Sequence, residues 1–152
     1  MILGIDPGPT ESGWALLNGA LVADSGVMCN EEVLTLIAKH SHRGNHLVIE
    51  KIASYGMPVG ADVFETVYWS GRMAQVYYAA GGAHEVVRIP RIDVKMALCH
   101  DSREKDTNIR QALIDLLGPP GVKAAPGPTY GVKSHAWAAL AVAVTARDTK
   151  EI

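Results

Sequence analysis

The chain has 152 residues, of which 48% are hydrophobic and 20% charged, a profile typical of one soluble globular domain over residues 1–152. No apolar run approaches the ~20 residues that a membrane span needs, and the N-terminus lacks a signal-peptide pattern, so we expect no membrane association and a cytoplasmic location. The net charge of −2 carries no general signature of nucleic-acid binding. Cys29 and Cys99 lack metal-type spacing, and we expect free buried thiols.

The first part of the sequence combines strand patterns with turn signals. Residues 1–6 form an apolar run, and residues 6–13 have the proline and glycine content of a turn. Residues 14–28 predict two strands joined at Asn18-Gly19, a dipeptide typical of hairpins. We therefore expect a three-stranded antiparallel meander. Two elements follow it: an amphipathic helix over residues 31–43 and a short apolar strand over residues 46–52.

The second part is richer in helical patterns. The expected elements are a loop over 53–60, a helix over 61–81, a strand over 83–90, and helices over 91–99, 106–118 and 134–148. Asp106 or Thr107 is expected to cap one of these helices, and Ser134 the last one. Residues 119–133 are rich in proline and glycine, which predicts an irregular loop. This order indicates an α/β fold whose mixed sheet is covered on both faces.

Two carboxylates, Asp6 and Glu50, share one context, because each stands at the end of an apolar strand. If these strands are neighbours, the acids meet at one edge of the sheet, where a divalent cation such as Mg²⁺ would relieve their repulsion. His135, at the start of the last helix, is a third candidate ligand. The residues alone leave other interpretations open: Asp6 could cap the turn, Glu50 could form a surface salt bridge, and His135 could be structural.

Several stretches resemble one known family. ILGIDPGPTESGWALL resembles the opening of RuvC-type Holliday-junction resolvases, which belong to the ribonuclease-H-like nuclease superfamily. HLVIEKI resembles their second acidic strand, RIPRIDVKMALCHDSREKDTNIRQALIDLLG their Pro-x-x-x-Val-Lys segment and lysine-bearing loop, and SHAWAALAVAVTA their last helix. IASYGMPVGADVFETVYWSGR is similar to the phage-type subgroup. The resemblance implies a mixed five-stranded sheet, an antiparallel meander plus parallel strands, flanked by helices.

The resemblance also implies an activity. Such a protein is a structure-selective endonuclease that cuts four-way (Holliday) or branched DNA, leaving 5′-phosphate and 3′-hydroxyl ends. Asp6, Glu50 and His135 match the family's catalytic, metal-binding positions. Two Mg²⁺ ions, which Mn²⁺ can replace, would activate water and neutralise the leaving oxygen. A homodimer is expected, because a two-fold symmetric junction requires two active sites.

Ala138 departs from the family pattern, because the family commonly carries its last aspartate there. Three explanations stay open: a subgroup that works with three ligands, an engineered inactivating change, or a binding-only copy. A neutral histidine at position 135 also lowers the negative charge of the site, which weakens metal affinity. The alternatives to a junction resolvase are a catalytically silent junction-binding homologue and another ribonuclease-H-like nuclease, acting on RNA–DNA hybrid or other branched DNA.

Candidate DNA contacts lie on basic and aromatic residues outside the acidic positions. By resemblance, Lys105 matches a lysine that supports phosphate binding near the site, with Arg103 beside it. Lys95 belongs to the same basic segment, Tyr55 could stack on a base, and Arg72 could reach a phosphate or pair with Glu65. The alternative is a solvated surface of mixed charge. Three further aromatic residues are expected to make core or dimer contacts: Phe64, Tyr68 and Trp69.

Overall fold

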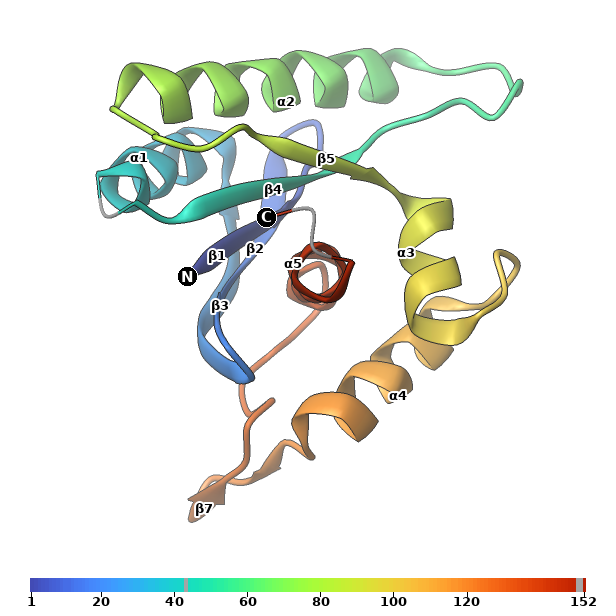
Figure 1. Cartoon of the computed structure of the whole chain (residues 1–152). Helices are drawn as coiled ribbons and strands as arrows, with labels where there is room; N and C mark the ends of the chain where they lie inside the picture. Colours follow the sequence, from blue (N-terminus) through green and yellow to red (C-terminus); the bar gives the residue numbers. More distant parts are fainter. Residues whose placement is uncertain (43, 150–151) are drawn as a thin grey trace.

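The structure of the chain is a computed structural model, and it describes residues 1–42, 44–149 and 152. Its centre is a five-stranded sheet with the strand order β3-β2-β1-β4-β5 (Figure 1). The strands are β1 (Ile2–Asp6), β2 (Glu11–Asn18), β3 (Leu21–Cys29), β4 (His46–Lys51) and β5 (Val87–Pro90). β1, β2 and β3 pair antiparallel, whereas β4 lies parallel to β1 and β5 parallel to β4. The expected mixed sheet, a meander extended by parallel strands, is confirmed.

The meander follows the sequence pattern, with one shift of a boundary. β2 begins at Glu11 rather than at Trp14, because its pairing with β3 continues to the end of that strand at Cys29. The hairpin that Asn18-Gly19 predicts is confirmed. Gly19 has a φ of 62°, a backbone conformation that glycine adopts without the steric cost of a side chain.

Helices cover both faces of the sheet. The helices are α1 (Asn30–Ser41), α2 (Ala61–Ala79), α3 (Arg91–Cys99), α4 (Asp106–Leu117) and α5 (Ala136–Asp148). Figure 1 shows α1 and α2 on one face and α5 on the other, with α3 and α4 beyond α5. In the described part of the chain, no helix has both the length and the apolar character that crossing a membrane requires.

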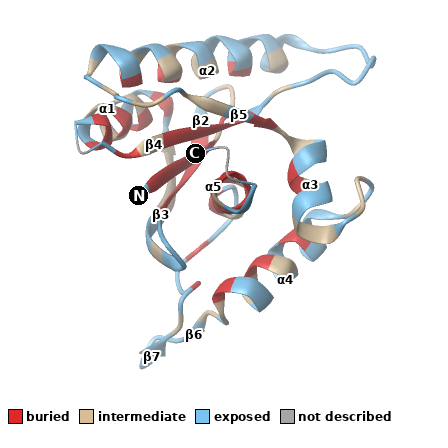
Figure 2. Ribbon diagram, viewed as in Figure 1, coloured by how far each residue is buried: buried red, intermediate tan, exposed pale blue. Residues whose placement is uncertain are grey.

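The alternation of residues along β1 divides the core between the two faces. Leu3 and Ile5 pack with the apolar residues of α1 and α2, whereas Ile2 packs with α5. β1, β2, β4 and α5 are the most deeply buried elements (Figure 2). The acidic end of β1 therefore lies at the edge of the most deeply buried part of the fold.

The start of α5 packs directly against glycines of strands β1 and β2. A Cβ atom on Gly4 would collide with the carbonyl oxygen of Ala139, and one on Gly13 would collide with the backbone and Cβ of His135. These two glycines therefore permit the contact that places the start of α5 beside the end of β1. The position of His135 in the site depends directly on this packing.

The predicted helix caps are wrong. Lys105 and His135 occupy the N-cap positions of α4 and α5, and neither helix has a capping side-chain hydrogen bond. Asp106 is the first residue of α4, but its carboxylate binds an arginine instead of a backbone amide. Ser134 precedes the cap of α5 and has a φ of 46°, in the left-handed region.

Three smaller expectations concern the loop 119–133, the two cysteines and the end of the first helix. The predicted loop 119–133 contains a short hairpin of β6 (Gly121–Val122) and β7 (Ala125–Pro126). Both cysteines are free, but Cys29 is exposed because it ends the edge strand β3, and Cys99 is half-buried. Arg43, the last residue of the helix predicted over 31–43, lies outside the described residues.

Candidate active site

The candidate site lies where the parallel strands β1, β4 and β5 end. Ile5 pairs with Ile49, so Asp6 and Glu50 follow at the same level of the sheet. β5 ends one residue before Arg91, which begins α3 at the same edge. The carboxyl ends of parallel strands are a common place for ligand sites. Here they border an open cavity of about 770 Å³, which His135 also lines.

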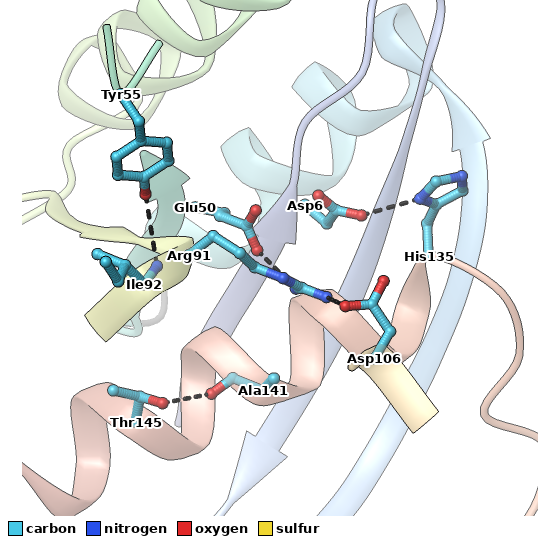
Figure 3. Close-up of polar contacts among 9 residues, drawn as sticks. All are labelled: Asp6, Glu50, Tyr55, Arg91, Ile92, Asp106, His135, Ala141 and Thr145. Atoms are coloured by element: carbon cyan, nitrogen blue, oxygen red, sulfur yellow. Dashed lines mark hydrogen bonds and ion pairs between the residues drawn. The ribbon is translucent and has the colours of Figure 1, made fainter. Parts of the chain in front are cut away.

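Asp6 and His135 form a direct pair in this cavity (Figure 3). The Nδ1 atom of His135 lies 3.0 Å from Oδ2 of Asp6. The Asp6 side chain is only 15% exposed. Burial raises the pKa of Asp6, and the hydrogen bond and charge of His135 oppose that rise.

The turn after β1 is stabilised by other residues. Ser12 accepts a hydrogen bond from the backbone N–H of Gly8 and donates one to Asn30, and the Asn30 amide donates to the Gly8 carbonyl. The turn therefore has a side-chain clamp of its own. The Asp6 carboxylate instead faces the cavity and His135.

Glu50 belongs to a second group of charges that crosses the cavity. Arg91 donates from one terminal nitrogen to Oε2 of Glu50 at 2.9 Å and from the other to Oδ1 of Asp106 at 2.7 Å (Figure 3). Glu50 therefore does form a salt bridge, but not a surface one, since its side chain is 11% exposed. Burial raises the pKa of Glu50 to about 7; the charge of Arg91 opposes the rise and that of Asp6 adds to it.

The chemistry of these side chains suits a divalent cation. Asp6 and Glu50 are desolvated carboxylates whose charges repel each other, and a hard cation with oxygen ligands relieves both costs. His135 adds a nitrogen ligand beside Asp6. Among residues 1–42, 44–149 and 152, however, no three side chains of His, Cys, Asp or Glu already stand together as a metal-binding group. Glu50 is instead paired with Arg91.

Two residues that form the ion pairs of the site, Arg91 and Asp106, were not predicted as site residues. Asp106 was expected only as a candidate helix cap. The signal for Arg91 is its position directly after a strand that lies parallel to the strand of Glu50. Asp106 has no comparable signal, because it comes from α4. Ala138 also lines the cavity and offers no carboxylate.

The candidate DNA contacts fall into two groups. Lys105 adjoins Asp106, and the hydroxyl of Tyr55 accepts the N–H of Ile92 at 3.4 Å, next to Arg91 (Figure 3). Lys95 lies on α3, half-buried, and Arg103 is 91% exposed beside Asp101. These four therefore border the elements that form the site.

Arg72 lies apart from the other candidate contacts. It is on α2, with its guanidinium 4.3 Å from the ring centroid of Trp69 and 5.7 Å from that of Tyr68. It does not line the cavity of Asp6. Among the described residues, the Arg72 guanidinium lies against these aromatic rings and forms no ion pair with Glu65, which was one of its two expected partners.

The comparisons with known proteins show the fold. No protein-family model matches the chain, and no curated protein matches it. Among solved structures, the chain is similar to RuvC of Thermus thermophilus, with a TM-score of 0.70 and 21% identity over 99% of this chain and 95% of that one. It is also similar to T. thermophilus RuvC in complex with a Holliday junction substrate, with a TM-score of 0.71 and 20% identity over 98% and 93% of the two chains. The expected ribonuclease-H-like fold is therefore confirmed over almost the whole chain.

Proposed function

We propose that this chain is a RuvC-type resolvase, an endonuclease that hydrolyses phosphodiester bonds at four-way or branched DNA junctions. The observation that carries the proposal is the meeting of Asp6, Glu50 and His135 at one cavity. They do so in a fold shared with a protein whose solved structure contains a Holliday junction. In the reaction, a water oxygen bonds to phosphorus while the P–O3′ bond breaks. The products are a 5′-phosphate and a 3′-hydroxyl.

The proposed metal ligands are Asp6, Glu50 and His135, and the proposed cofactor is Mg²⁺, which Mn²⁺ can replace. The resemblance implies two ions. A bound divalent ion lowers the pKa of water and stabilises the charge that develops on the phosphate oxygens. Asp6 must then be ionised, and its hydrogen bond to His135 orients the carboxylate towards the cavity. Glu50 must lose its proton, so metal affinity is expected to rise with pH through about 7.

DNA binding is proposed to follow the residues around the cavity. Lys95 provides positive charge on α3, and Arg103 and Lys105 provide it on the segment between α3 and α4. These charges suit backbone phosphates. Tyr55 is 57% exposed beside the start of α3, where its ring is available for stacking on an unpaired base. Arg72 is proposed as a weaker contact, because its guanidinium already stacks on aromatic rings.

A homodimer is proposed through the outer face of α2. Phe64 is 66% exposed and Tyr68 60%, and with Val67 they follow a helical spacing on the face turned away from the core. Burial of such an aromatic surface between two copies would remove it from water. Two-fold symmetry would then present two sites to a junction. The proposed location is the cytoplasm, a reducing compartment that suits the free thiols of Cys29 and Cys99.

A second candidate function is junction binding without cleavage. Ala138 removes one carboxylate from the cavity wall, and Arg91 engages Glu50 directly. Both features lower the capacity of the site for metal ions. They leave the proposed phosphate contacts outside the cavity unchanged.

The deciding experiment compares substrates and metals. The full-length chain is incubated with a synthetic four-way junction, a linear duplex and an RNA–DNA hybrid, each with Mg²⁺, Mn²⁺ or EDTA. Cutting of the junction alone, with either metal and not in EDTA, is expected. Junction binding without cutting in both metals would support the second candidate, and cutting of the hybrid would support a different nuclease. Recovery of cutting in Ala138→Asp would identify Ala138 as the cause of inactivity.

A further inference from the structure

Arg91 is a fixed positive charge inside an acidic cavity. Its side chain is 23% exposed and makes one charged hydrogen bond to Glu50 and another to Asp106. The guanidinium is anchored at both ends, from β4 and from α4, across the site (Figure 3). Burial lowers the pKa of Arg91, but the charges of Glu50 and Asp106 outweigh this and raise it, so the group stays charged at every relevant pH.

The charge of Arg91 opposes a second metal ion beside Glu50. The terminal nitrogens of the guanidinium lie 2.9 Å from Oε2 of Glu50 and 2.7 Å from Oδ1 of Asp106, so a divalent cation bound to Glu50 would lie next to a fixed positive charge. Ala138, which also lines the cavity, offers no carboxylate to hold that cation.

The location of Arg91 divides the ligands into two sets. Asp6 and His135 are hydrogen-bonded to each other, so a carboxylate and an imidazole lie together at the end of β1. Glu50 is hydrogen-bonded to the guanidinium of Arg91 instead. Of the five N–H donors of a guanidinium, these two hydrogen bonds to Glu50 and Asp106 use two, so donors remain for a phosphate oxygen.

We propose that Arg91, anchored by Asp106, takes the place of a second metal ion beside Glu50, so that the site works with one divalent ion bound at Asp6 and His135. In this arrangement the guanidinium binds a non-bridging oxygen of the phosphate that is cut. The inference rests on the proposed nuclease function and narrows its metal requirement from the two ions of the resemblance to one, with Glu50 held by Arg91 and not by a metal ion. Asp106 is then a positioning residue, because it acts by orienting Arg91.

The test measures metal stoichiometry, which does not depend on cleavage. Mn²⁺ is titrated into the metal-free full-length protein, and bound ion is quantified by electron paramagnetic resonance and equilibrium dialysis. The wild-type chain is expected to bind one Mn²⁺ per chain. Arg91→Gln is expected to bind Mn²⁺ about tenfold more tightly, because a nearby positive charge is removed. Two ions per chain are expected in Arg91→Gln combined with Ala138→Asp.

Arg88→Gln provides the matched control, since Arg88 lies on β5 but outside this cavity. It removes the same charge and should leave Mn²⁺ binding unchanged. Two Mn²⁺ ions bound by the wild-type chain would overturn the proposal, whether or not any variant folds. Equal Mn²⁺ affinity in folded Arg91→Gln and the wild type would overturn it as well. A wild-type chain that binds one Mn²⁺ but cuts no junction would refute the nuclease function and leave the stoichiometry established.

Discussion

Replacing Glu50 with glutamine isolates the cost of holding a carboxylate in the cavity. Burial raises the pKa of Glu50 from 4.5 to about 7, against the opposing charge of Arg91. The folded protein therefore binds this proton more tightly than the unfolded chain does. The contribution of Glu50 to stability is fully present below pH 4.5 and is lost as the pH rises through 7.

The size of this effect follows from the two pKa values. The difference between 4.5 and about 7 corresponds to about 3 kcal/mol of unfolding free energy. Glutamine has the shape of the protonated glutamic acid and does not titrate. Glu50→Gln should therefore match the wild type near pH 4.5 and exceed its stability by about 3 kcal/mol at pH 8. For a chain of this length, that gain raises Tm by roughly 6–12 °C.

The assay is urea unfolding in EDTA, followed by circular dichroism at several pH values between 4.5 and 8.5. Glu65→Gln is the control, because Glu65 is exposed on α2 and the substitution removes the same charge. Its pH profile should run parallel to that of the wild type. If the stability of Glu50→Gln falls with pH as steeply as that of the wild type, ionisation of the buried Glu50 carboxyl group does not lower the stability of the folded protein. The electrostatic account of the cavity is then wrong.

Three other predictions concern the site and its support. Asp6→Asn should abolish junction cutting and leave binding in a gel-shift assay largely intact; loss of binding in a folded protein would contradict its role as a metal ligand. Gly13→Ala should lower stability by about 1–3 kcal/mol in thermal unfolding and disturb His135, whereas Gly71→Ala, where a Cβ meets open space on α2, should not lower it. Lys105→Ala should weaken junction binding and reduce the slope of log K against log salt by about 1, and an unchanged slope would exclude a phosphate contact.

The meander was predictable because it rests on short-range patterns. Apolar runs ending in Asp6 and Glu50 identify two buried strands, and Asn18-Gly19 identifies a hairpin. Each of these predictions uses a spacing of few residues, at which backbone geometry dominates. The meeting of the two acids at one edge depends on the parallel pairing of β1 and β4, which the sequence patterns left as a condition and the family resemblance implied.

The contacts of Asp106 were not predictable in the same way. An aspartate at a helix start normally binds a backbone amide, but here the guanidinium of Arg91 is within reach and provides a stronger, charged partner. That partner comes from a different helix, so no local pattern reports it. Ser134 failed as a cap for a local reason, its left-handed backbone, which its residue type does not favour.

Strand-specific mapping of the ends formed on a four-way junction tests the proposed function most directly. The full-length chain, Mg²⁺ and a junction labelled in turn on each strand are used, and the products are treated with DNA ligase. Two nicks at symmetric positions in opposing strands, sealed by the ligase because they carry 5′-phosphate and 3′-hydroxyl ends, are expected. A junction that is bound but stays intact with both Mg²⁺ and Mn²⁺ would contradict the proposal.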